Sequence, residues 1–561
     1  MKSLHFLLTA VALAAVVSSG VAAPAPVSVE NKAAARAEFA KARALSSSDI
    51  TGAVAGMRKA IELDPDYCEG HQYFILYSGM AASGAPGALI LPSNAAVPSD
   101  EEKKAAEKRT SEKKAAGEKA RAATLALYEQ WAKEQPDRAA YQYALGIQFE
   151  YADPDRALRH FEAAVKLDPK CGDAYGALAT CAEVRGKLEQ SREYLRLAVE
   201  ADPDNATSWR HYIAEYREAD IDKGIALGLE MAKKFPDEAA SVLGYLATRQ
   251  RNEAKAREIY ELLHAKFPKA AARNLTSLFS IYLKSDRAKA LALAQEMAAL
   301  VPENKEWPVL VDYAKALIDS DAFIAAGKPA EALAALGKIT LPRYGADRRW
   351  LHLERAQATA ASGQTEKAYA DLLALMIKTP TDEYQAALTG YGEKLGRNAA
   401  QVTAEVMTQR AAAAKPGVPF SLVNYYTAKR VALDDYKGRV VLVNFWYPMC
   451  GPCRGEFPFL QAALEKYRDQ GFEILAINGN APEDHMVLPL LKGWKLDFLP
   501  LKSDGAVVKN YKVRGFPSNF LYGPDGKIYY EPPPVNGLGA QRELEMQIEA
   551  LLAQAKLTPK T

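Results

Sequence analysis

The sequence predicts an α-solenoid of helical repeats followed by a C-terminal α/β domain. Two observations predict this division. Prolines recur at intervals of about 34 residues through much of the first 300 residues. After about residue 416, apolar strand-like runs alternate with helix-like runs instead. A chain of 561 residues is also too long for one hydrophobic core, so more than one domain is expected.

The N-terminus predicts an export signal. Lys2 precedes an apolar run at residues 4–17, and small residues follow up to Ala23. This order is typical of a secretory signal peptide, and the run is shorter than the roughly 20 residues that span a bilayer. We expect residues 1–23 to be removed, leaving a soluble exported protein in a bacterial periplasm. An uncleaved N-terminal membrane anchor is the alternative.

The overall composition excludes several classes of partner. The formal net charge of +2 does not favour nucleic acid or an anionic membrane surface. The seven histidines have no metal-ligand spacing, so neither a metal nor another cofactor is expected. Cys68, Cys171 and Cys181 are interpreted as buried structural thiols. On one straight helix Cys171 and Cys181 would lie about 15 Å apart, which is too far for a disulfide.

The proline ladder predicts the repeat type. Successive steps are 33, 34, 33, 32 and 34 residues between Pro136, Pro169, Pro203, Pro236, Pro268 and Pro302. A period near 34 is typical of tetratricopeptide repeats. The unit at residues 172–203 resembles that repeat most clearly, with Tyr175, Leu178 and Ala179, then Ser191, Leu195 and Ala198, and the closing Pro203. We expect six to nine helix pairs between about residues 32 and 400.

Stacked helix pairs bury their apolar faces together and form a concave surface. Such a surface favours a protein partner, although the fold alone does not fix the function. Residues 99–121 are rich in lysine, glutamate and alanine, and they predict a charged helical insertion. Its i,i+4 pairs are Lys103–Glu107, Lys108–Glu112 and Lys114–Glu118. A solvated, lengthened helix is favoured there over a partner-binding arm.

The C-terminal domain is expected at residues 416–556, after a linker at residues 401–415. Strands are predicted at residues 420–423, 439–445 and 472–478. A strand–turn–strand hairpin is predicted at residues 518–530 around Pro524-Asp525-Gly526, and a closing helix at residues 542–555.

Two cysteines in this domain predict its chemistry. Cys450-Gly451-Pro452-Cys453 follows the apolar strand at residues 440–443 and precedes a helix-like pattern at residues 454–468. The first sulfur therefore lies at a helix N-terminus, where free N–H groups and the macrodipole stabilise an anion. Since the thiolate is the reactive form of cysteine, the pattern predicts dithiol–disulfide exchange with proteins that carry thiols or disulfides.

The domain resembles the TlpA-like branch of the thioredoxin superfamily, which consists of exported thiol–disulfide oxidoreductases with a redoxin domain. The matching positions are Lys437-Gly438-Arg439, Asn444-Phe445-Trp446, Cys450-Gly451-Pro452-Cys453, Arg454-Gly455-Glu456-Phe457-Pro458, Val513-Arg514-Gly515-Phe516-Pro517 and Gly523-Pro524-Asp525-Gly526. This resemblance implies a thioredoxin fold. It departs from the branch at Met449, where relatives usually have tryptophan, so partner choice is expected to differ.

Each site residue has an expected role. Cys450 is the attacking thiolate, and Cys453, one turn inside the helix, resolves the mixed disulfide. Pro452 removes a backbone donor where its loss costs little. Pro517 resembles the cis-proline of the superfamily, which faces the sulfurs and aligns the substrate strand. Trp446 is expected to pack beside the site.

Glu456 is the expected proton-transfer group. Asn444 stands where thioredoxins proper carry a buried aspartate, and asparagine does not titrate. Glu456 lies three residues after Cys453, on the same helical face, and it matches the acid of the TlpA-like motif. Burial would raise its pKa and suit it to proton transfer. A solvated glutamate at the helix N-terminus is the alternative.

Three functions remain open at this point. The favoured one is an exported oxidoreductase whose repeats dock a protein client, together with an unidentified electron donor or acceptor. The second is a repeat scaffold in which Cys450–Cys453 is a permanent disulfide. The third is a thiol peroxidase, which normally needs a threonine three residues before the attacking cysteine, where this chain has Tyr447. The direction of electron flow is not predicted.

Overall fold

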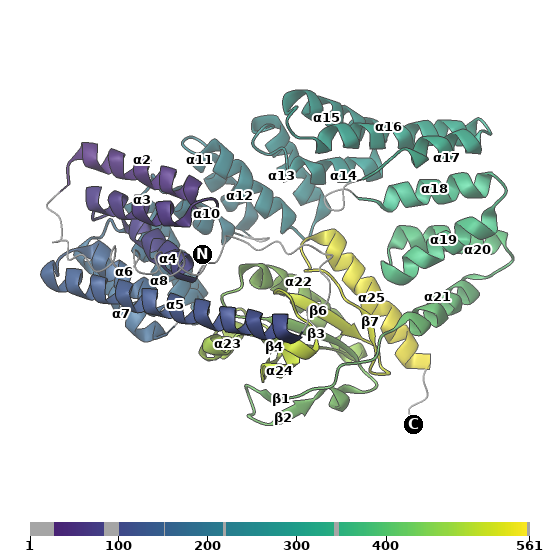
Figure 1. The fold of residues 1–561 in the computed structure, drawn as a ribbon. Helices are drawn as coiled ribbons and strands as arrows, with labels where there is room; N and C mark the ends of the chain where they lie inside the picture. The colour runs from purple at the N-terminus through teal and green to yellow at the C-terminus, as the bar shows by residue number, and fades with distance from the viewer. Residues whose placement is uncertain (1–26, 84–99, 151, 217–219, 342–346, 558–561) are drawn as a thin grey trace. The chain divides into compact units, whose positions relative to one another are not determined.

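The computed structural model describes residues 27–83, 100–150, 152–216, 220–341 and 347–557 (Figure 1). The predicted export signal at residues 1–23 lies outside these ranges. Within them, no helix combines the length and the apolar character that crossing a membrane requires. The chain divides into two compact units, one of residues 1–183 with 187–209, the other of residues 184–186 with 210–561.

The first unit consists of consecutive helices that pack on their neighbours in the chain. They are α2 (Val29–Leu45), α3 (Ile50–Leu63), α4 (Cys68–Ser83), α5 (Asp100–Glu134), α6 (Ala139–Phe149), α7 (Pro154–Leu167), α8 (Gly172–Val184, whose last residue falls in the second unit) and α9 (Leu188–Ala201). Pro65 and the ladder prolines Pro169 and Pro203 each directly follow the residue that caps a helix C-terminus. Since the residue before a proline disfavours the helical conformation, these prolines end the helices.

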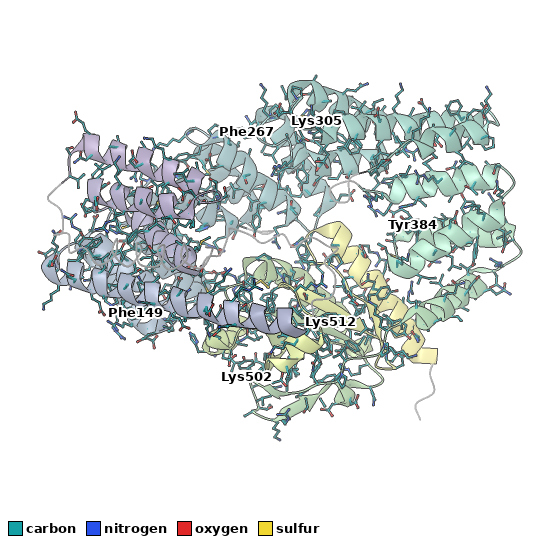
Figure 2. The ribbon with its side chains drawn as sticks, in the orientation of Figure 1. Phe149, Phe267, Lys305, Tyr384, Lys502 and Lys512 are labelled. Carbon is teal, nitrogen blue, oxygen red and sulfur yellow. A yellow bond between two sulfur atoms is a disulfide. The ribbon has the colours of Figure 1, made fainter. Side chains whose placement is uncertain are left out.

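The predicted repeat at residues 172–203 forms α8 and α9. Leu178, Ala179, Leu195 and Ala198 are all buried, as the repeat pattern requires. Leu178 belongs to an apolar cluster with residues of α6 and α7, among them Phe149, which ends α6 and is labelled in Figure 2. Neighbouring pairs thus bury their apolar faces against one another.

The charged stretch forms the N-terminal part of α5, a helix of 35 residues. Lys108–Glu112 and Lys114–Glu118 lie 4.0 Å apart as i,i+4 pairs with exposed side chains. The side chains of Lys103 and Glu107 lie outside the described part of the chain. The expectation of a lengthened, solvated helix is confirmed for the remainder.

Helical repeats continue from residue 206 to residue 413. The helices are α10 (Ala206–Ala214), α11 (Ile221–Met231), α12 (Pro236–Thr248), α13 (Glu253–Lys266), α14 (Leu275–Ser285), α15 (Arg287–Leu300), α16 (Glu306–Ala325), α17 (Pro329–Gly337), α18 (Arg349–Ala361), α19 (Thr365–Lys378), α20 (Asp382–Lys394) and α21 (Ala399–Ala413).

Six to nine helix pairs were predicted between about residues 32 and 400. In the described residues, α2 to α20 are nineteen helices over this range, which make nine pairs and one further helix, and α21 follows them. The proline ladder undercounts them because later helices end differently. Gly327, Gly363 and Gly396 follow the C-caps of α16, α18 and α20 with positive φ, a conformation that glycine adopts without strain.

The segment at residues 401–415 was predicted as a linker, but most of it is α21. Asn398 and Gln401 form a capping box at the start of this helix, and Val402, Val406 and Arg410 are buried. The alanine-rich sequence that suggested a linker is also the sequence with the highest helix propensity. Packing against the preceding repeats stabilises it as a helix.

The C-terminal part contains a seven-stranded sheet with the order β2-β1-β5-β4-β3-β6-β7. The strands are β1 (Ser421–Asn424), β2 (Arg430–Ala432), β3 (Val440–Trp446), β4 (Phe472–Asn478), β5 (Leu499–Lys502), β6 (Ser518–Tyr522) and β7 (Ile528–Tyr530). β3, β4 and β5 are parallel, whereas β6 runs antiparallel to β3, and β7 to β6. The helices are α22 (Gly451–Tyr467), α23 (Asp484–Gly493), α24 (Ala506–Asn510) and α25 (Leu538–Leu557).

The central strand β3 is buried on both faces. Val440, Leu442 and Trp446 lie in a cluster with residues of α22 and α25, and Val441, Val443 and Phe445 lie in a second cluster with residues of α24. This alternation follows from the two-residue period of a strand. It places Asn444 on the same face of the sheet as α22.

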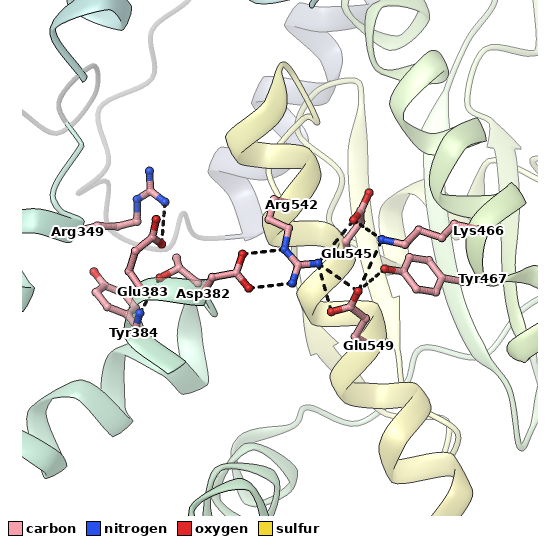
Figure 3. Close-up of polar contacts among 10 residues, drawn as sticks. Arg349, Asp382, Glu383, Tyr384, Lys466, Tyr467, Arg542, Glu545 and Glu549 are labelled. Carbon is pink, nitrogen blue, oxygen red and sulfur yellow. Dashed lines mark hydrogen bonds and ion pairs between the residues drawn. The ribbon is translucent and has the colours of Figure 1, made fainter. Parts of the chain in front are cut away.

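The last helix, α25, also contacts the repeat helix α20. Arg542 donates to both carboxylate oxygens of Asp382 over 2.8 Å, and it pairs with Glu549 on its own helix (Figure 3). Lys466 and Tyr467 of α22 extend this network through Glu545 and Glu549. The α/β domain and the last repeats therefore share polar contacts within the second unit.

Candidate active site at Cys450 and Cys453

Cys450 is the N-cap of α22. Its Sγ accepts a hydrogen bond from the backbone N–H of Cys453 over 3.2 Å, and the two cysteines form a disulfide. Gly451 and Pro452 occupy the first helical positions and are exposed, whereas Cys450 is only 3% exposed and Cys453 is 0% exposed. The sulfur of Cys450 thus lies where the unpaired N–H groups of the helix stabilise negative charge.

Glu456, three residues after Cys453 in α22, is fully buried, so the alternative of a solvated glutamate is wrong. Asn444 donates from Nδ2 to Glu456 Oε1 over 2.8 Å, and Asn519 donates from Nδ2 to Oε2 over 3.2 Å. The backbone N–H of Val535 donates to Oε2 over 3.0 Å. Three elements of the domain, β3, β6 and the segment before α25, therefore hold one carboxyl group in place.

Burial raises the pKa of Glu456 from its ordinary value of 4.5 to about 7, as the sequence led us to expect. The hydrogen bonds from Val535, Asn519 and Asn444 oppose this effect because they stabilise the carboxylate. A carboxyl group with a pKa near neutrality can both accept and release a proton under ordinary conditions.

Pro517 lies at the same edge of the sheet. The Phe516–Pro517 peptide bond is cis, and Pro517 is buried. In the β3–β6 ladder Ser518 pairs with Phe445, so Pro517 lies at the level of Trp446, where β3 leads into the cysteine loop. The ring of Phe516 packs edge-on against Tyr447, with 5.3 Å between the ring centroids.

Trp446 is a packing residue. Its side chain is fully buried and contacts Phe457 edge-on, with 5.1 Å between the ring centroids. It shares an apolar cluster with Cys450 and Cys453, so it fixes the wall behind the cysteine loop. The structure therefore brings together Trp446, Cys450, Pro452, Cys453, Glu456 and Pro517 at one end of β3.

Two residues near the site were not predicted from the sequence. Glu483, just before α23, accepts a hydrogen bond from the backbone N–H of Met449 over 2.7 Å and another from Asn480 Nδ2 over 2.7 Å. Burial raises its pKa. It lies in the segment at residues 481–499, whose role the sequence left open, and a lone glutamate there carries no recognisable signal.

Arg249 is the second such residue, and it comes from the repeat region. It caps the C-terminus of α12, and its guanidinium donates to the backbone carbonyl of Gly455 in α22. Its positive charge lowers the pKa of Glu456 slightly against the larger effect of burial. No periodic feature of the repeats marks this arginine, which explains why the sequence did not reveal it.

No group of histidine, cysteine, aspartate and glutamate side chains in the described ranges has an arrangement that could hold a metal ion. The groups at this site that could take part in exchange or titrate near neutral pH are the two sulfurs and the Glu456 carboxyl.

Family models match two parts of the chain. The AhpC/TSA family model matches residues 414–531, and a tetratricopeptide repeat model matches residues 151–206. Both matches agree with the architecture described above, a thioredoxin-fold domain that follows helical repeats.

Two curated relatives and one solved structure each match a quarter of the chain or less. Thiol-disulfide oxidoreductase ResA of Bacillus thuringiensis subsp. konkukian is 31% identical over 142 residues, which cover 25% of this chain and 76% of the relative. ResA of Bacillus subtilis is 36% identical over 101 residues, covering 18% and 56%. The thioredoxin domain of a thiol-disulfide oxidoreductase from Bacteroides vulgatus is 25% identical, with 23% and 93% covered and a TM-score of 0.21.

Proposed function

The chain belongs to the family of thiol-disulfide oxidoreductases that includes ResA, and from this premise we propose its specific activity. It exchanges disulfides with client proteins through Cys450 and Cys453, outside the cytoplasm. Its tetratricopeptide repeats hold a protein partner. The electron donor or acceptor is another protein with a thiol or disulfide.

The hydrogen bond from the Cys453 N–H to Cys450 Sγ is the observation that carries this proposal. A sulfur that caps a helix and accepts a backbone hydrogen bond is stabilised as a thiolate once the disulfide is reduced. Both cysteines are almost fully buried, but Cys450 caps the helix whereas Cys453 lies inside it. This difference in position supports attack by Cys450 and resolution by Cys453.

The exchange consists of two displacements. The Cys450 thiolate attacks one sulfur of a client disulfide, forming a mixed disulfide and releasing the other client sulfur as a thiolate. The Cys453 thiolate then attacks Cys450 Sγ, which releases the second client sulfur and closes the Cys450–Cys453 disulfide. The client gains two electrons, and two protons pass to its thiols. Transfer from a dithiol client is the same sequence in reverse.

Glu456 acts as the proton carrier for Cys453. Cys453 must lose its proton before it attacks, and Glu456 is three residues further along the same helix. Because the Glu456 pKa is about 7, its carboxylate is populated at neutral pH and accepts this proton. Asn444 and Asn519 orient the carboxyl group and do not titrate.

The repeats and the N-terminus support the wider parts of the proposal. A partner held on the repeat surface would be presented to Cys450 at a raised effective concentration. Lys2, the apolar run at residues 4–17 and the small residues up to Ala23 support export. The N-terminal sequence of the protein isolated from its native cell, with cell fractionation, tests the export step.

Turnover of a protein disulfide such as that of insulin tests the catalytic assignment. Cys450→Ser should abolish turnover, Cys453→Ser should accumulate mixed disulfides with clients, and Cys181→Ser is the matched control with normal turnover. Undiminished turnover in Cys450→Ser would refute the assignment. Identification of the proteins trapped by Cys453→Ser would name the clients.

Two further assays distinguish the alternatives. A reduction potential far below the glutathione range, together with absent turnover, would favour a scaffold with a permanent Cys450–Cys453 disulfide. Consumption of hydrogen peroxide would favour a peroxidase. Tyr447 occupies the position where that chemistry normally uses threonine, and its ring packs against Phe516.

A further inference from the structure

Cys68 and Cys171 meet in the first unit, although 103 residues separate them in sequence. Cys68 is the first residue of α4, and Cys171 directly precedes α8. Their sulfurs lie 2.9 Å apart, and both side chains are buried. The sequence suggested three unrelated structural thiols, and it weighed only the pair Cys171 and Cys181.

The repeat architecture explains why these two cysteines meet. Cys68 comes three residues after Pro65, and Cys171 comes two residues after Pro169, so both lie in the turn that starts a new helix pair. Both belong to one apolar cluster with Ala140 of α6. Stacking of the three pairs α4–α5, α6–α7 and α8–α9 brings their first turns around one cavity, which residues of all three turns line. No local pattern encodes this juxtaposition.

We propose that Cys68 and Cys171 form a second disulfide, which links the α4 and α8 repeats of the first unit. A disulfide has an S–S length of about 2.05 Å, so the sulfurs need to approach by about 0.9 Å. Movement of the side chains at Cys68 and Cys171 would have to close this gap.

The oxidant is a disulfide of the glutathione class. One cysteine thiolate attacks the oxidant and releases one thiol, forming a mixed disulfide. The other cysteine then attacks the protein sulfur of that bond and releases the second thiol. Two protein thiols thus lose two electrons and two protons, and the oxidant becomes two thiols.

A cavity of about 580 Å³ lies beside this pair. Both cysteines line it, together with residues of the turn at Pro136 that connects α5 to α6. Arg138 also lines the cavity and pairs with Asp66. Both cysteines are therefore buried, and they adjoin a cavity whose lining includes charged side chains.

The pair differs chemically from Cys450 and Cys453. The hydrogen bond between Cys68 and Cys171 and the burial of Cys68 both raise the pKa of the Cys68 thiol, so little thiolate forms at neutral pH. The bond should therefore form slowly in the folded chain and rapidly during folding, and once formed it should resist reduction. It would act as a structural cross-link that closes a 103-residue span.

Alkylation of the full-length chain under denaturing conditions, followed by peptide mass spectrometry, tests this proposal. The chain is first refolded with oxidised glutathione, which removes the kinetic protection that burial provides. We expect a linked peptide pair containing Cys68 and Cys171, with Cys181 alkylated. Cys450–Cys453 in the same molecule is the internal control that the oxidant has acted.

Variants provide the matched comparisons. Cys181→Ser should retain the linked pair, whereas Cys68→Ser should leave Cys171 alkylated. The oxidised wild-type chain should unfold at a temperature about 10 °C above that of its reduced form in the transition of the first unit. The double variant Cys68→Ser/Cys171→Ser should not respond to oxidation in this transition.

Two results would overturn the proposal. One is complete alkylation of both Cys68 and Cys171 after refolding under conditions that fully oxidise Cys450–Cys453. The other is a linked pair that contains Cys181 in place of either residue. The wild-type chain alone decides both, so the result does not depend on the folding of a variant.

Discussion

The side-chain amide of Asn444 donates a hydrogen bond to Oε1 of Glu456 over 2.8 Å, in the buried layer between β3 and α22. The Asn444 amide also donates to Asn519 Oδ1 over 2.8 Å. An asparagine orients its neighbours without exchanging protons, so titration at this point falls to Glu456. Asn444 of β3 thus orients the carboxyl group, and Glu456 of α22 is the group that titrates.

The raised pKa of Glu456 predicts a pH-dependent stability. Between pH 4.5 and about 7 the folded state binds more protons than the unfolded state, so this contribution is present below pH 4.5 and is lost as the pH rises through about 7. The loss amounts to about 3 kcal/mol, from a pKa change of 4.5 to about 7. Urea titrations, read by hydrogen exchange of the β3 peptide, should show this decline in the wild type and not in Glu456→Gln. Parallel pH profiles for the two proteins would contradict it.

Glu456→Gln should also change the pH dependence of exchange. Glutamine keeps the size of the side chain but carries no titrating proton. In the wild type, the rate at which the Cys450–Cys453 disulfide closes should change with pH near pH 7, and this limb of the pH–rate profile should disappear in the variant. The rate at neutral pH should fall about 100-fold. Stopped-flow measurement of the second displacement, starting from a mixed disulfide at Cys450, separates this step from the first attack. A retained limb near pH 7 would assign the proton to another group.

Arg249 should influence the pH at which this limb of the pH–rate profile lies. Its charge lowers the pKa of Glu456, so Arg249→Met should move the limb above pH 7, whereas Arg249→Lys, which keeps a cation, should move it less. The pH–rate profile of the second displacement reports this change. An unmoved limb in Arg249→Met would show that the arginine contacts α22 without electrostatic influence on the acid.

Glu483 should hold the loop that leads to Cys450. Glu483→Ala removes the acceptor of the Met449 N–H, whereas Glu483→Gln retains a carbonyl oxygen for it. We expect the Met449 amide to exchange with deuterium about tenfold faster or more in the alanine variant, and close to the wild-type rate in the glutamine variant. Equal protection in all three proteins would mean that the loop is held by other contacts.

The ion pair between Arg542 and Asp382 should contribute little to stability by itself. The side chains are 42% and 58% exposed, and exposed pairs contribute about 1 kcal/mol or less. A double-mutant cycle with Arg542→Ala and Asp382→Ala should give a coupling in this range that declines at high salt. Arg542→Ala should cost more than Asp382→Ala, because it also removes the contacts with Glu549. A salt-insensitive coupling above about 2 kcal/mol would contradict this estimate.

Strong local patterns predicted much of the α/β domain. β4 was predicted with the observed bounds because it is a run of mostly apolar residues between clear breaks, and the hairpin predicted at residues 518–530 contains β6 and β7. Cys450 was expected at the mouth of a helix, and it is the N-cap of α22. Glu456 and Pro517 were identified as site residues with the help of the resemblance to the TlpA-like branch, because local patterns do not mark them.

The remaining features depend on tertiary contacts. β2 has three residues and β5 has four, and both form because neighbouring strands pair with them. α21 was predicted as a linker because alanine-rich sequence is compatible with either state until packing decides. The approach of Cys68 to Cys171 and the reach of Arg249 to α22 arise from the stacking of repeats, which sequence spacing alone does not specify.

The segment between α21 and the sheet also covers part of the sheet's edge. Lys415, two residues after α21, exchanges both backbone hydrogen bonds with Ile528 over 2.9 Å each, and Ile528 begins β7, the last strand on that side. Exposed edge strands invite pairing with extended segments of other chains. At Ile528 those bonding positions are already occupied from within, so neither an unfolded client nor a second copy can extend the sheet there. This border of the sheet is therefore protected from edge-to-edge aggregation at Ile528.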